Sequence, residues 1–430
     1  MPKKLIAPGY MHNFRCLGGD CEDTCCQKWD INLDQVHYKI LASKVKSNQQ
    51  DQDLFNSNIC LHNIEHSSEG NYAYIKLDES GYCPFLNASG LCHLHDHYGV
   101  EPLSDICAFF PRVLSERDET VELTGALSCP EVVRQCLLTE KEAQAMSPLD
   151  KRVLPRAEYP LSRKIETETD NYLHRFLDVR EQMLSLMGDS DYSFEVRLYF
   201  LANFSYRLAS FYHQGCDASQ RVDEEIKRIR SDDIKKQLDD YFFKFNNTEP
   251  VAIVVTQAVL QLRIQHEGND KLSKLAKKIL EGYKVNYEKS EDFDVYGENI
   301  PPDKLALSFQ QHWDKLNTRY GVQLEDYLAR YVTNCLQREW YISLPDPFVY
   351  IHMLTIRVAV LRFLITSHPD IIVLLDDDIS VEDFNKKIVE VMYLYARSID
   401  HNHAFLHVIF QAIYEQQMMS FDYSMAFIKV

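Results

Sequence analysis

The sequence predicts a mainly α-helical protein, an irregular multi-helix bundle with a loop-rich, cysteine-rich N-terminal domain. Apolar residues make up 45% of the 430 residues and charged residues 26%, so the chain can bury a large core. Ten of the 12 cysteines precede residue 137, whereas apolar positions recur at helical spacing after about residue 150. We therefore expect a cysteine-rich domain over residues 1–140 and an α-helical domain over residues 141–430.

The N-terminal domain contains few long helical periods. Residues 34–45 predict one helix and residues 120–124 predict a short strand. Pairs such as Pro8-Gly9 and Gly18-Gly19 interrupt the remainder, which indicates loops. Such a stretch buries too little apolar surface to order itself, and a bound metal centre would supply the missing stability.

A series of helices is predicted in the C-terminal domain. Gly188 and Gly215 end the first two, Pro302 opens a later one, and Ser380 with Asp383 predicts an N-terminal capping box. Short loops without a fixed repeat favour a bundle over a solenoid. The expected ranges are 161–187, 193–214, 222–245, 249–266, 271–283, 302–320, 324–338, 347–367, 381–399 and 403–419.

The charge of the chain argues against a nucleic-acid partner. The formal net charge is −18, from 46 Lys and Arg against 64 Asp and Glu, and no basic block is present. A surface of this charge repels a phosphate backbone.

A membrane partner is not expected either. The apolar stretches 251–262 and 348–366 are too short or are interrupted by His352, Arg357 and Arg362. The N-terminus lacks the apolar region of a signal peptide. We therefore expect a cytoplasmic protein.

Eight N-terminal cysteines form the pattern of a metal site. In a reducing compartment cysteines serve as metal ligands or reactive thiols more often than as disulfides. Neighbouring residues cannot readily point at one ion, so one of Cys25 and Cys26 is expected to ligate and the other to pack, bind elsewhere or react. The candidate ligands are Cys16, Cys21, Cys25, Cys26, Cys83, Cys92, Cys107 and Cys129.

Three interpretations of these thiols remain open. The density of thiols favours an iron–sulfur cluster, zinc is the second interpretation, and burial as small apolar side chains is the third. The absence of a Cys-x2-Cys pair argues against a zinc ribbon. His93, His95 and His97 alternate, so on an extended segment they would share one face and could add ligands.

Several short motifs run through the chain. They are Pro8-Gly9-Tyr10-Met11, the run from Cys16 to Cys26 with Trp29 after it, Cys83-Pro-Phe-Leu86, Leu91-Cys92, Leu103-Ser104-x2-Cys107-x2-Phe110-Pro-Arg112, Leu127-Ser-Cys-Pro-Glu131 with Arg134, and the sparser Tyr327-Leu328, Asn334 and Arg397-x2-Asp400-His401-Asn402. Together they resemble the bacterial flagellin lysine N-methylase family. A broader set of iron- or zinc-chelating proteins shares the adjacent cysteines and the Cys-Pro-Phe-Leu element, although two residues commonly separate the cysteines that correspond to Cys21 and Cys25.

The resemblance implies an enzyme of the cytoplasm. It implies transfer of methyl groups from S-adenosylmethionine to lysine side chains of flagellin, with a 4Fe–4S cluster as cofactor. No glycine-rich loop follows a predicted strand, so a Rossmann-type donor site is disfavoured. A cluster held by three thiolates would leave one iron open to chelate the donor, and a purely structural cluster is equally compatible with the chemistry.

Five further residues are candidates because they flank the matched motifs. Asp105, Glu131 and Asp400 could hold the lysine amine or accept its proton, and the alternative is a solvated surface carboxylate. Arg112 and Arg134 could pair with the donor carboxylate, and the alternative is an ordinary salt bridge. A function of another class also remains open, namely a metal-binding structural or redox-sensing interaction protein without methyl transfer.

Overall fold

The fold was obtained as a computed structural model, which describes residues 3–28, 30–63, 68–161, 163–165, 175–213, 218–245, 250–266, 270–283, 302–338, 347–376 and 380–429. The chain divides into two compact units. The N-terminal unit comprises Met1–Gln135 and Glu142–Ile165, and the helical unit comprises Cys136–Lys141 and Glu166–Val430. Trp29, Cys216 and residues 166–174 of the first expected helix lie outside the described residues.

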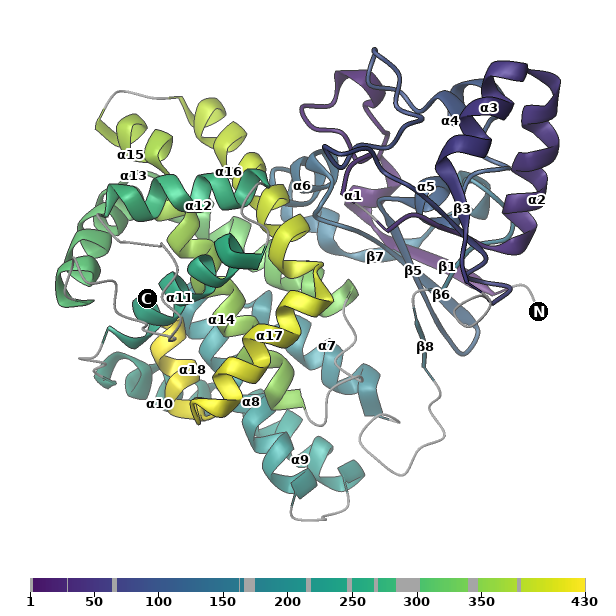
Figure 1. The fold of residues 1–430 in the computed structure, drawn as a ribbon. Coiled ribbons are helices and arrows are strands. Elements are labelled where there is room, and N and C mark those ends of the chain that lie inside the picture. The colour runs from purple at the N-terminus through teal and green to yellow at the C-terminus, as the bar shows by residue number, and fades with distance from the viewer. Residues whose placement is uncertain are drawn as a thin grey trace. The chain divides into compact units, whose positions relative to one another are not determined.

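A five-stranded sheet forms the frame of the N-terminal unit, with the strand order β7-β1-β6-β5-β8 (Figure 1). Strand β1 runs parallel to β6 and antiparallel to β7, while β5 runs antiparallel to β6 and parallel to β8. The expected strand at 120–124 is confirmed as β6, and the other strands were not predicted. The bounds are β1 Lys4–Pro8, β5 Arg112–Arg117, β6 Thr120–Gly125, β7 Met146–Pro148 and β8 Arg163–Ile165.

A second sheet and several short helices complete this unit. Strand β4 (Ala73–Ile75) pairs antiparallel with β2 (Asn32–Leu33) and β3 (Ile59–Leu61). The helix expected at 34–45 is confirmed as α2, and Asp34 caps it by accepting the N–H groups of Val36 and His37. The helices are α1 Gly9–His12, α2 Gln35–Lys44, α3 Gln49–Asn58, α4 His93–Tyr98, α5 Asp105–Phe109 and α6 Pro130–Leu137.

The three alternating histidines do not lie on an extended segment. His93, His95 and His97 belong to α4, where His93 and His97 share a face with their ring centroids 4.0 Å apart and helical geometry turns His95 away from it. The Nε2 atom of His93 lies 2.7 Å from Oδ1 of Asp51, whose other oxygen accepts from the hydroxyl of Tyr98. The expectation of one shared histidine face was therefore wrong.

The helical unit confirms the mainly α fold class. Its helices are α7 Phe176–Met187, α8 Phe194–His213, α9 Ala218–Ile229, α10 Asp232–Lys244, α11 Val251–His266, α12 Lys271–Gly282, α13 Pro302–Arg338, α14 Pro347–Thr366, α15 Pro369–Asp376, α16 Val381–Tyr395, α17 His403–Glu415 and α18 Phe421–Ile428. A π-helical segment, Ala396–Asp400, follows α16 directly.

Four details of the helix prediction were wrong. The range 161–187 contains β8, and its helix begins only at Phe176. The range 222–245 is divided between α9 and α10, because Ser231 has extended backbone angles. Conversely, 302–320 and 324–338 join into α13 across a kink at Tyr320, whose ring stacks on Phe384 at 4.1 Å. Helices α15 and α18 were not predicted.

Helix α14 is the core of the helical unit. It contacts α8, α11, α13, α15, α16 and α18, and in Figure 1 it lies among them. Among the described residues it is the one helix long and apolar enough to cross a membrane, but 94% of its apolar window is buried inside the protein. Packing within the unit therefore accounts for its apolar surface.

The N-terminal cap of α16 is confirmed. The Ser380 hydroxyl accepts the N–H of Asp383 at 3.2 Å, which satisfies one free donor of the first turn. The apolar stripe that follows is buried as expected; it comprises Phe384, Ile388, Val391, Met392 and Tyr395.

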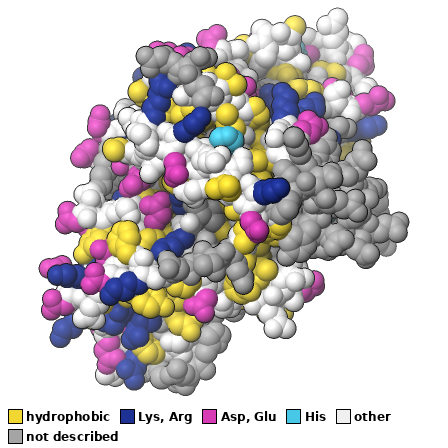
Figure 2. Space-filling model, turned by 90° about the vertical axis from the view of Figure 1, so that its left-hand side faces the viewer, with side chains coloured by type: hydrophobic (Ala, Val, Ile, Leu, Met, Phe, Trp, Pro, Cys, Tyr) yellow, Lys and Arg dark blue, Asp and Glu magenta, His cyan; other side chains and the backbone are white. Residues whose placement is uncertain are grey.

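Figure 2 shows that on one face of the molecule basic and acidic side chains are interspersed with apolar ones.

Buried His352 gives the helical unit a predicted acid sensitivity. Its Nδ1 lies 2.6 Å from the Ser424 hydroxyl, and burial lowers its pKa to about 4. The unfolded state, with a pKa near 6.5, therefore binds more protons between pH 6.5 and 4, so stability falls as the pH falls through this window. We expect His352 to make the unit about 2 kcal/mol less stable at pH 5 than at pH 7.

The measurement is denaturant unfolding at both pH values for the wild type and for His352→Asn, which can keep the bond to Ser424. Other groups titrate equally in the two proteins, so the difference between their pH slopes isolates this residue. Identical pH slopes would contradict the prediction.

Candidate metal centre

Four of the eight candidate cysteines meet in one region of the N-terminal unit. Cys25 and Cys83 lie on loops, Cys92 directly precedes α4, and Cys107 lies in α5. The N–H of Cys83 donates to the carbonyl of Cys26 at 2.9 Å, and Leu86 pairs with Cys92 in an isolated antiparallel bridge. The first of these contacts joins segments that are more than 50 residues apart, and the second closes a local loop of six residues. We call Cys25, Cys83, Cys92 and Cys107 the four-thiol group.

The thiols of this group influence one another electrostatically. Burial, together with the nearby thiols of Cys92 and Cys25, raises the pKa of Cys83 to about 11. Desolvation also raises the pKa of Cys107, although part of this residue reaches solvent, and the thiols of Cys92, Cys83 and Cys25 again add to the effect. Without a metal the buried thiols stay protonated. A bound metal ion would compensate the negative charge of the thiolates that form when these protons leave.

Backbone N–H groups also face one of these sulfurs. Burial raises the pKa of Cys92, while the N–H groups of His95 and Leu94, in the first turn of α4, stabilise its thiolate. Bonds of this kind to ligand sulfurs tune iron–sulfur centres. Sequence reasoning did not identify these donors, since they depend on the helical start at His93.

The sheet brings three other candidate cysteines together. Strands β1 and β6 are parallel, so their carboxyl ends meet at one edge of the sheet. The segment after β1 carries Cys16 and Cys21, and the segment after β6 carries Cys129. The backbone N–H of Gly125, at the end of β6, donates to the Tyr10 hydroxyl at 3.3 Å and joins the two segments. We call Cys16, Cys21 and Cys129 the three-thiol group.

The sulfur of Cys129 is the buried member of this group. Its pKa is raised to about 12, chiefly by burial and also by the thiols of Cys21 and Cys16, while the N–H groups of Val132 and Glu131 in α6 oppose the rise. Cys16 lies nearer to solvent and its sulfur accepts the N–H of Gly18 at 3.4 Å. The group thus has one buried sulfur and an accessible side.

Arg112 lies at the same edge of the sheet. It is the first residue of β5 and pairs in register with Gly125, the last residue of β6. Burial lowers the pKa of its guanidinium, and the nearby thiols of Cys16 and Cys129 raise it. The guanidinium lies over the ring of Phe14 at 5.2 Å. Among the residues that the structure describes, no carboxylate forms an ion pair with Arg112.

Arg134, the second candidate for the donor carboxylate, is engaged by protein groups. One of its nitrogens lies 2.5 Å from Glu22, next to Cys21, and another binds Glu131. Gln135 donates to the second oxygen of Glu131 at 2.8 Å. Glu131 and Arg134 therefore lie beside the three-thiol group, but they neutralise each other.

The other two candidate carboxylates also bind guanidinium groups, and Asp105 lies two residues before Cys107 in α5. Asp105 forms an ion pair with Arg156 and lies with Asp34 and His37 in a group whose ligand atoms are within 4.8 Å of one another. Asp400 lies in the helical unit with its side chain fully buried, 2.7 Å from Arg357 and 2.9 Å from Arg338.

The eighth candidate cysteine, Cys26, is joined to the four-thiol group through its backbone carbonyl, which accepts the N–H of Cys83.

The donor set fits a thiolate-ligated metal. Two of the grouped cysteines, Cys83 and Cys129, are buried, and backbone N–H groups support the sulfurs of Cys92 and Cys129, as in iron–sulfur sites. Among the described residues the one group of three ligand atoms within 4.8 Å of one another is Asp34, His37 and Asp105, so no three sulfurs are as close as a zinc ion requires. None of the eight candidate cysteines is in a disulfide bond in the structure. We therefore treat this arrangement as a candidate metal centre. Cys136, which is buried on α6, is not one of the candidate ligands.

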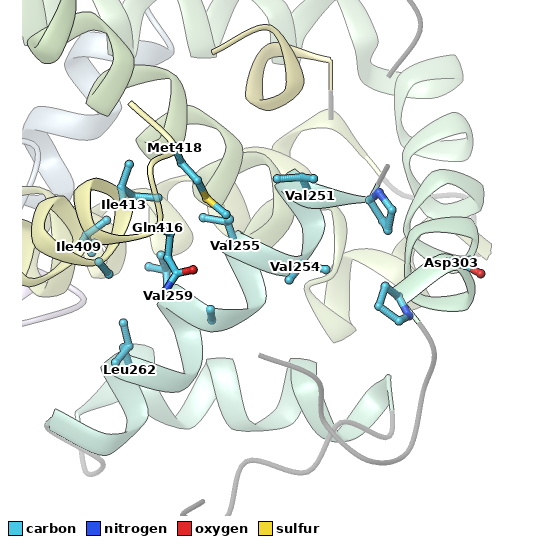
Figure 3. Close-up of a pocket in the computed structure, with 14 residues that line it drawn as sticks. Val251, Val254, Val255, Val259, Leu262, Asp303, Ile409, Ile413, Gln416 and Met418 are labelled. Atoms are coloured by element: carbon cyan, nitrogen blue, oxygen red, sulfur yellow. The ribbon is translucent and has the colours of Figure 1, made fainter. Parts of the chain in front are cut away.

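The helical unit contains an apolar cavity of about 550 Å³ (Figure 3). Side chains of α11 such as Val255 and Val259 face Ile409 and Ile413 of α17 across it. Its polar lining is limited to Asp303 and Gln416 among the described residues. None of the predicted site residues lines this cavity, and Asp303 is the one titratable side chain in its lining among the described residues.

Comparisons with known proteins point to one family. A family model described as the FliB lysine N-methylase C-terminal domain matches residues 180–427. Two relatives named lysine-N-methylase, from Salmonella choleraesuis strain SC-B67 and Salmonella typhimurium strain LT2, are 32% identical over 148 residues. These matches cover 33% of this chain and 34% of each relative.

A third relative is aligned over most of its length. The flagellar biosynthetic protein FliU of Salmonella muenchen is 34% identical over 147 residues, which cover 33% of this chain and 81% of the relative. The chain thus spans about a third of the length of the two lysine-N-methylases that it matches. No solved structure matches the chain.

Proposed function

The chain belongs to the FliB lysine N-methylase family, and on this premise we propose that it transfers methyl groups from S-adenosylmethionine to lysine side chains of flagellin. The observation that carries the proposal is the family match across the helical unit, over residues 180–427. The flagellar name of the third relative supports flagellin as the substrate, and we place the reaction in the cytoplasm, before export.

The proposed reaction needs no oxidant or reductant. The lone pair of a neutral lysine amine forms the new N–C bond while the C–S bond of the sulfonium breaks, which leaves a neutral thioether. The methylated ammonium then loses a proton before another transfer can follow. The protein must therefore lower the pKa of the lysine by desolvation and hold donor and amine in line.

The net charge of the chain suits a lysine-bearing partner. Acidic groups exceed basic groups by 18, and carboxylates attract ammonium groups during encounter. Asp105, Glu131 and Asp400 stay candidates for accepting the proton. Each already binds a guanidinium, from Arg156, Arg134 and Arg357 respectively, so water is an alternative acceptor.

We further propose that the N-terminal cysteines hold an iron–sulfur cluster. When bound, the cluster would fix the surrounding loops and could offer an open iron to the amino and carboxylate groups of the donor. Its ligands would come from the four-thiol and three-thiol groups, in which Cys83 and Cys129 are buried and backbone N–H groups support the sulfurs of Cys92 and Cys129. A non-enzymatic metal-binding protein would use the same thiols, so the test must include the substrate.

Co-expression with flagellin tests the enzymatic proposal. Under iron-replete, reducing conditions we expect flagellin lysines to gain whole methyl groups by mass spectrometry, and flagellin expressed alone should not. Purified chain, flagellin and S-adenosylmethionine should reproduce the mass change. Unmodified flagellin in both experiments, with a folded and metal-loaded chain, would reject methyl transfer and leave the metal-binding alternative.

A further inference from the structure

We propose that Asp34, His37 and Asp105 bind one divalent transition-metal ion, which joins the start of α2 to the start of α5. The site uses none of the candidate cysteines, so it is separate from the proposed iron–sulfur cluster. It depends on neither flagellin nor the methyl donor.

The three side chains offer donor atoms at a spacing that suits one ion. A carboxylate oxygen of Asp34, a carboxylate oxygen of Asp105 and a ring nitrogen of His37 all lie within 4.8 Å of one another. Donors that share one ion at about 2.1 Å each lie up to about 4.2 Å apart, so shifts of less than about 1 Å bring all three into range. In the described part of the chain no other three histidine, cysteine or carboxylate groups meet this spacing.

The start of α2 fixes two of the three ligands. Oδ1 of Asp34 caps the helix, where it accepts the backbone N–H groups of Val36 at 2.8 Å and of His37 at 3.0 Å. The second oxygen, Oδ2, faces Nδ1 of His37. One oxygen of Asp34 is therefore used to orient the carboxylate, and the other lies beside the imidazole with which it would share the ion.

Arg156 orients the third ligand, Asp105. Its guanidinium binds Oδ1 of Asp105 and also donates to the carbonyl oxygens of Leu103 at 3.0 Å and Glu101 at 3.3 Å. Arg156 is the one cation that binds Asp105 among the described residues, and it contacts only Oδ1. The other oxygen is thereby left for an ion, as in metal sites where outer groups hold the ligating carboxylates.

Other contacts hold the two helix starts in place. The ammonium group of Lys44, in the last turn of α2, lies 2.7 Å from the carboxylate of Glu101. Ser104 caps α5, where its hydroxyl accepts the N–H of Cys107 at 3.3 Å. These contacts need no metal, so the frame of the site is preorganised.

The donor set favours a first-row transition metal. Two carboxylates supply the oxygen donors that manganese prefers, and one imidazole supplies the nitrogen donor that zinc and iron prefer. Magnesium and calcium take oxygen donors, so the imidazole disfavours them. The two carboxylates outnumber the one guanidinium of Arg156, which leaves negative charge for a cation to neutralise. All three ligands are partly exposed, so water can fill the remaining positions.

A bound ion would stabilise the N-terminal unit. Asp34 and Asp105 are about 70 residues apart in the chain, and an ion shared between them would tie α2 to α5. Helix α5 also carries Cys107, so the ion would fix the helix on which one candidate thiol ligand lies.

Manganese is the probe, because it prefers carboxylates to thiolates and so avoids the cysteines. In a titration of the anaerobically prepared full-length chain, followed by paramagnetic resonance of free Mn²⁺, we expect one bound ion per chain. Pulsed measurements should show coupling of the bound ion to a histidine nitrogen. Zinc should displace the manganese, whereas magnesium at the same concentration should not.

Single substitutions test the three ligands. His37→Gln, Asp34→Asn and Asp105→Asn should each weaken Mn²⁺ binding at least about tenfold. His37→Gln should also abolish the nitrogen coupling. Asp34→Asn keeps the helix cap, because asparagine caps as well as aspartate. Asp53→Asn, an exposed position of α3, and His62→Gln are the matched controls and should bind Mn²⁺ like the wild type.

The alternative is an ion pair of an imidazolium at His37 with the two carboxylates, and it predicts that no metal binds. Absence of Mn²⁺ binding, bound Mn²⁺ without nitrogen coupling, or ligand variants that bind like the controls would each overturn the proposal. Displacement by magnesium would overturn the choice of a transition metal. Where circular dichroism shows that a variant does not fold, the stoichiometry and nitrogen coupling of the wild type decide. These measurements involve no methyl transfer, so their failure and that of the proposed function are distinguishable.

Discussion

Replacing Asp400 with asparagine is expected to lower the free energy of unfolding of the helical unit by about 3–5 kcal/mol. The carboxylate is fully buried and lies 2.7 Å from Arg357 and 2.9 Å from Arg338. The hydroxyl of Tyr331 also donates to it, at 2.8 Å. Asparagine keeps the shape but removes the negative charge that faces the two buried guanidinium groups of Arg357 and Arg338.

Asp326→Asn is the matched control for this experiment. Asp326 lies in the same unit, is largely exposed, and approaches Arg330 only to 3.8 Å. An exposed pair of this kind contributes less than about 1 kcal/mol, so this variant should unfold like the wild type. Thermal and denaturant unfolding of both variants give the comparison.

The same experiment separates a structural from a catalytic role for Asp400. If Asp400 only holds the helices together, loss of activity in Asp400→Asn should follow the loss of folded protein and recover on cooling. A variant as stable as the wild type but without methyl transfer would contradict the structural assignment and would support the catalytic candidate.

Local signals explain which parts of the fold could be predicted from the sequence. The cap at Ser380 and the buried stripe of α16 depend on residues within five turns of one helix, and both were predicted. Strand β8 was mistaken for helix because its identity depends on pairing with β5, about 50 residues away. Its three residues carry too little periodicity to reveal that partner.

The grouping of the thiols in space also depends on contacts between distant residues, which the sequence does not reveal. Their density and spacing identified the eight candidate cysteines, but not how the fold distributes them. Cys129 joins Cys16 and Cys21 only because β6 lies parallel to β1, an arrangement set by strand pairing over more than 100 residues. The sequence could not predict that Arg134 binds a carboxylate whereas Arg112 does not among the described residues, because this difference depends on the position of Glu22 in space.

Replacing Arg112 with glutamine is expected to weaken binding of S-adenosylmethionine about 10- to 100-fold. The estimate follows from about 1.5–3 kcal/mol for a hydrogen bond that involves a charged group. Arg112→Lys should lose less, because it keeps the charge but not the two parallel N–H donors. Arg152→Gln is the matched control, since its guanidinium is 90% exposed and binds only Asp150 among the described residues.

Calorimetric titration with donor and iron analysis of the same samples distinguish two roles for Arg112. If the guanidinium binds the donor carboxylate, donor affinity falls while iron content stays at the wild-type value. In steady-state assays the KM for the donor should then rise more than kcat falls. If the guanidinium instead balances the charge of the thiolates, iron content falls and the remaining loaded protein binds donor normally, which would contradict the pairing of Arg112 with the donor carboxylate.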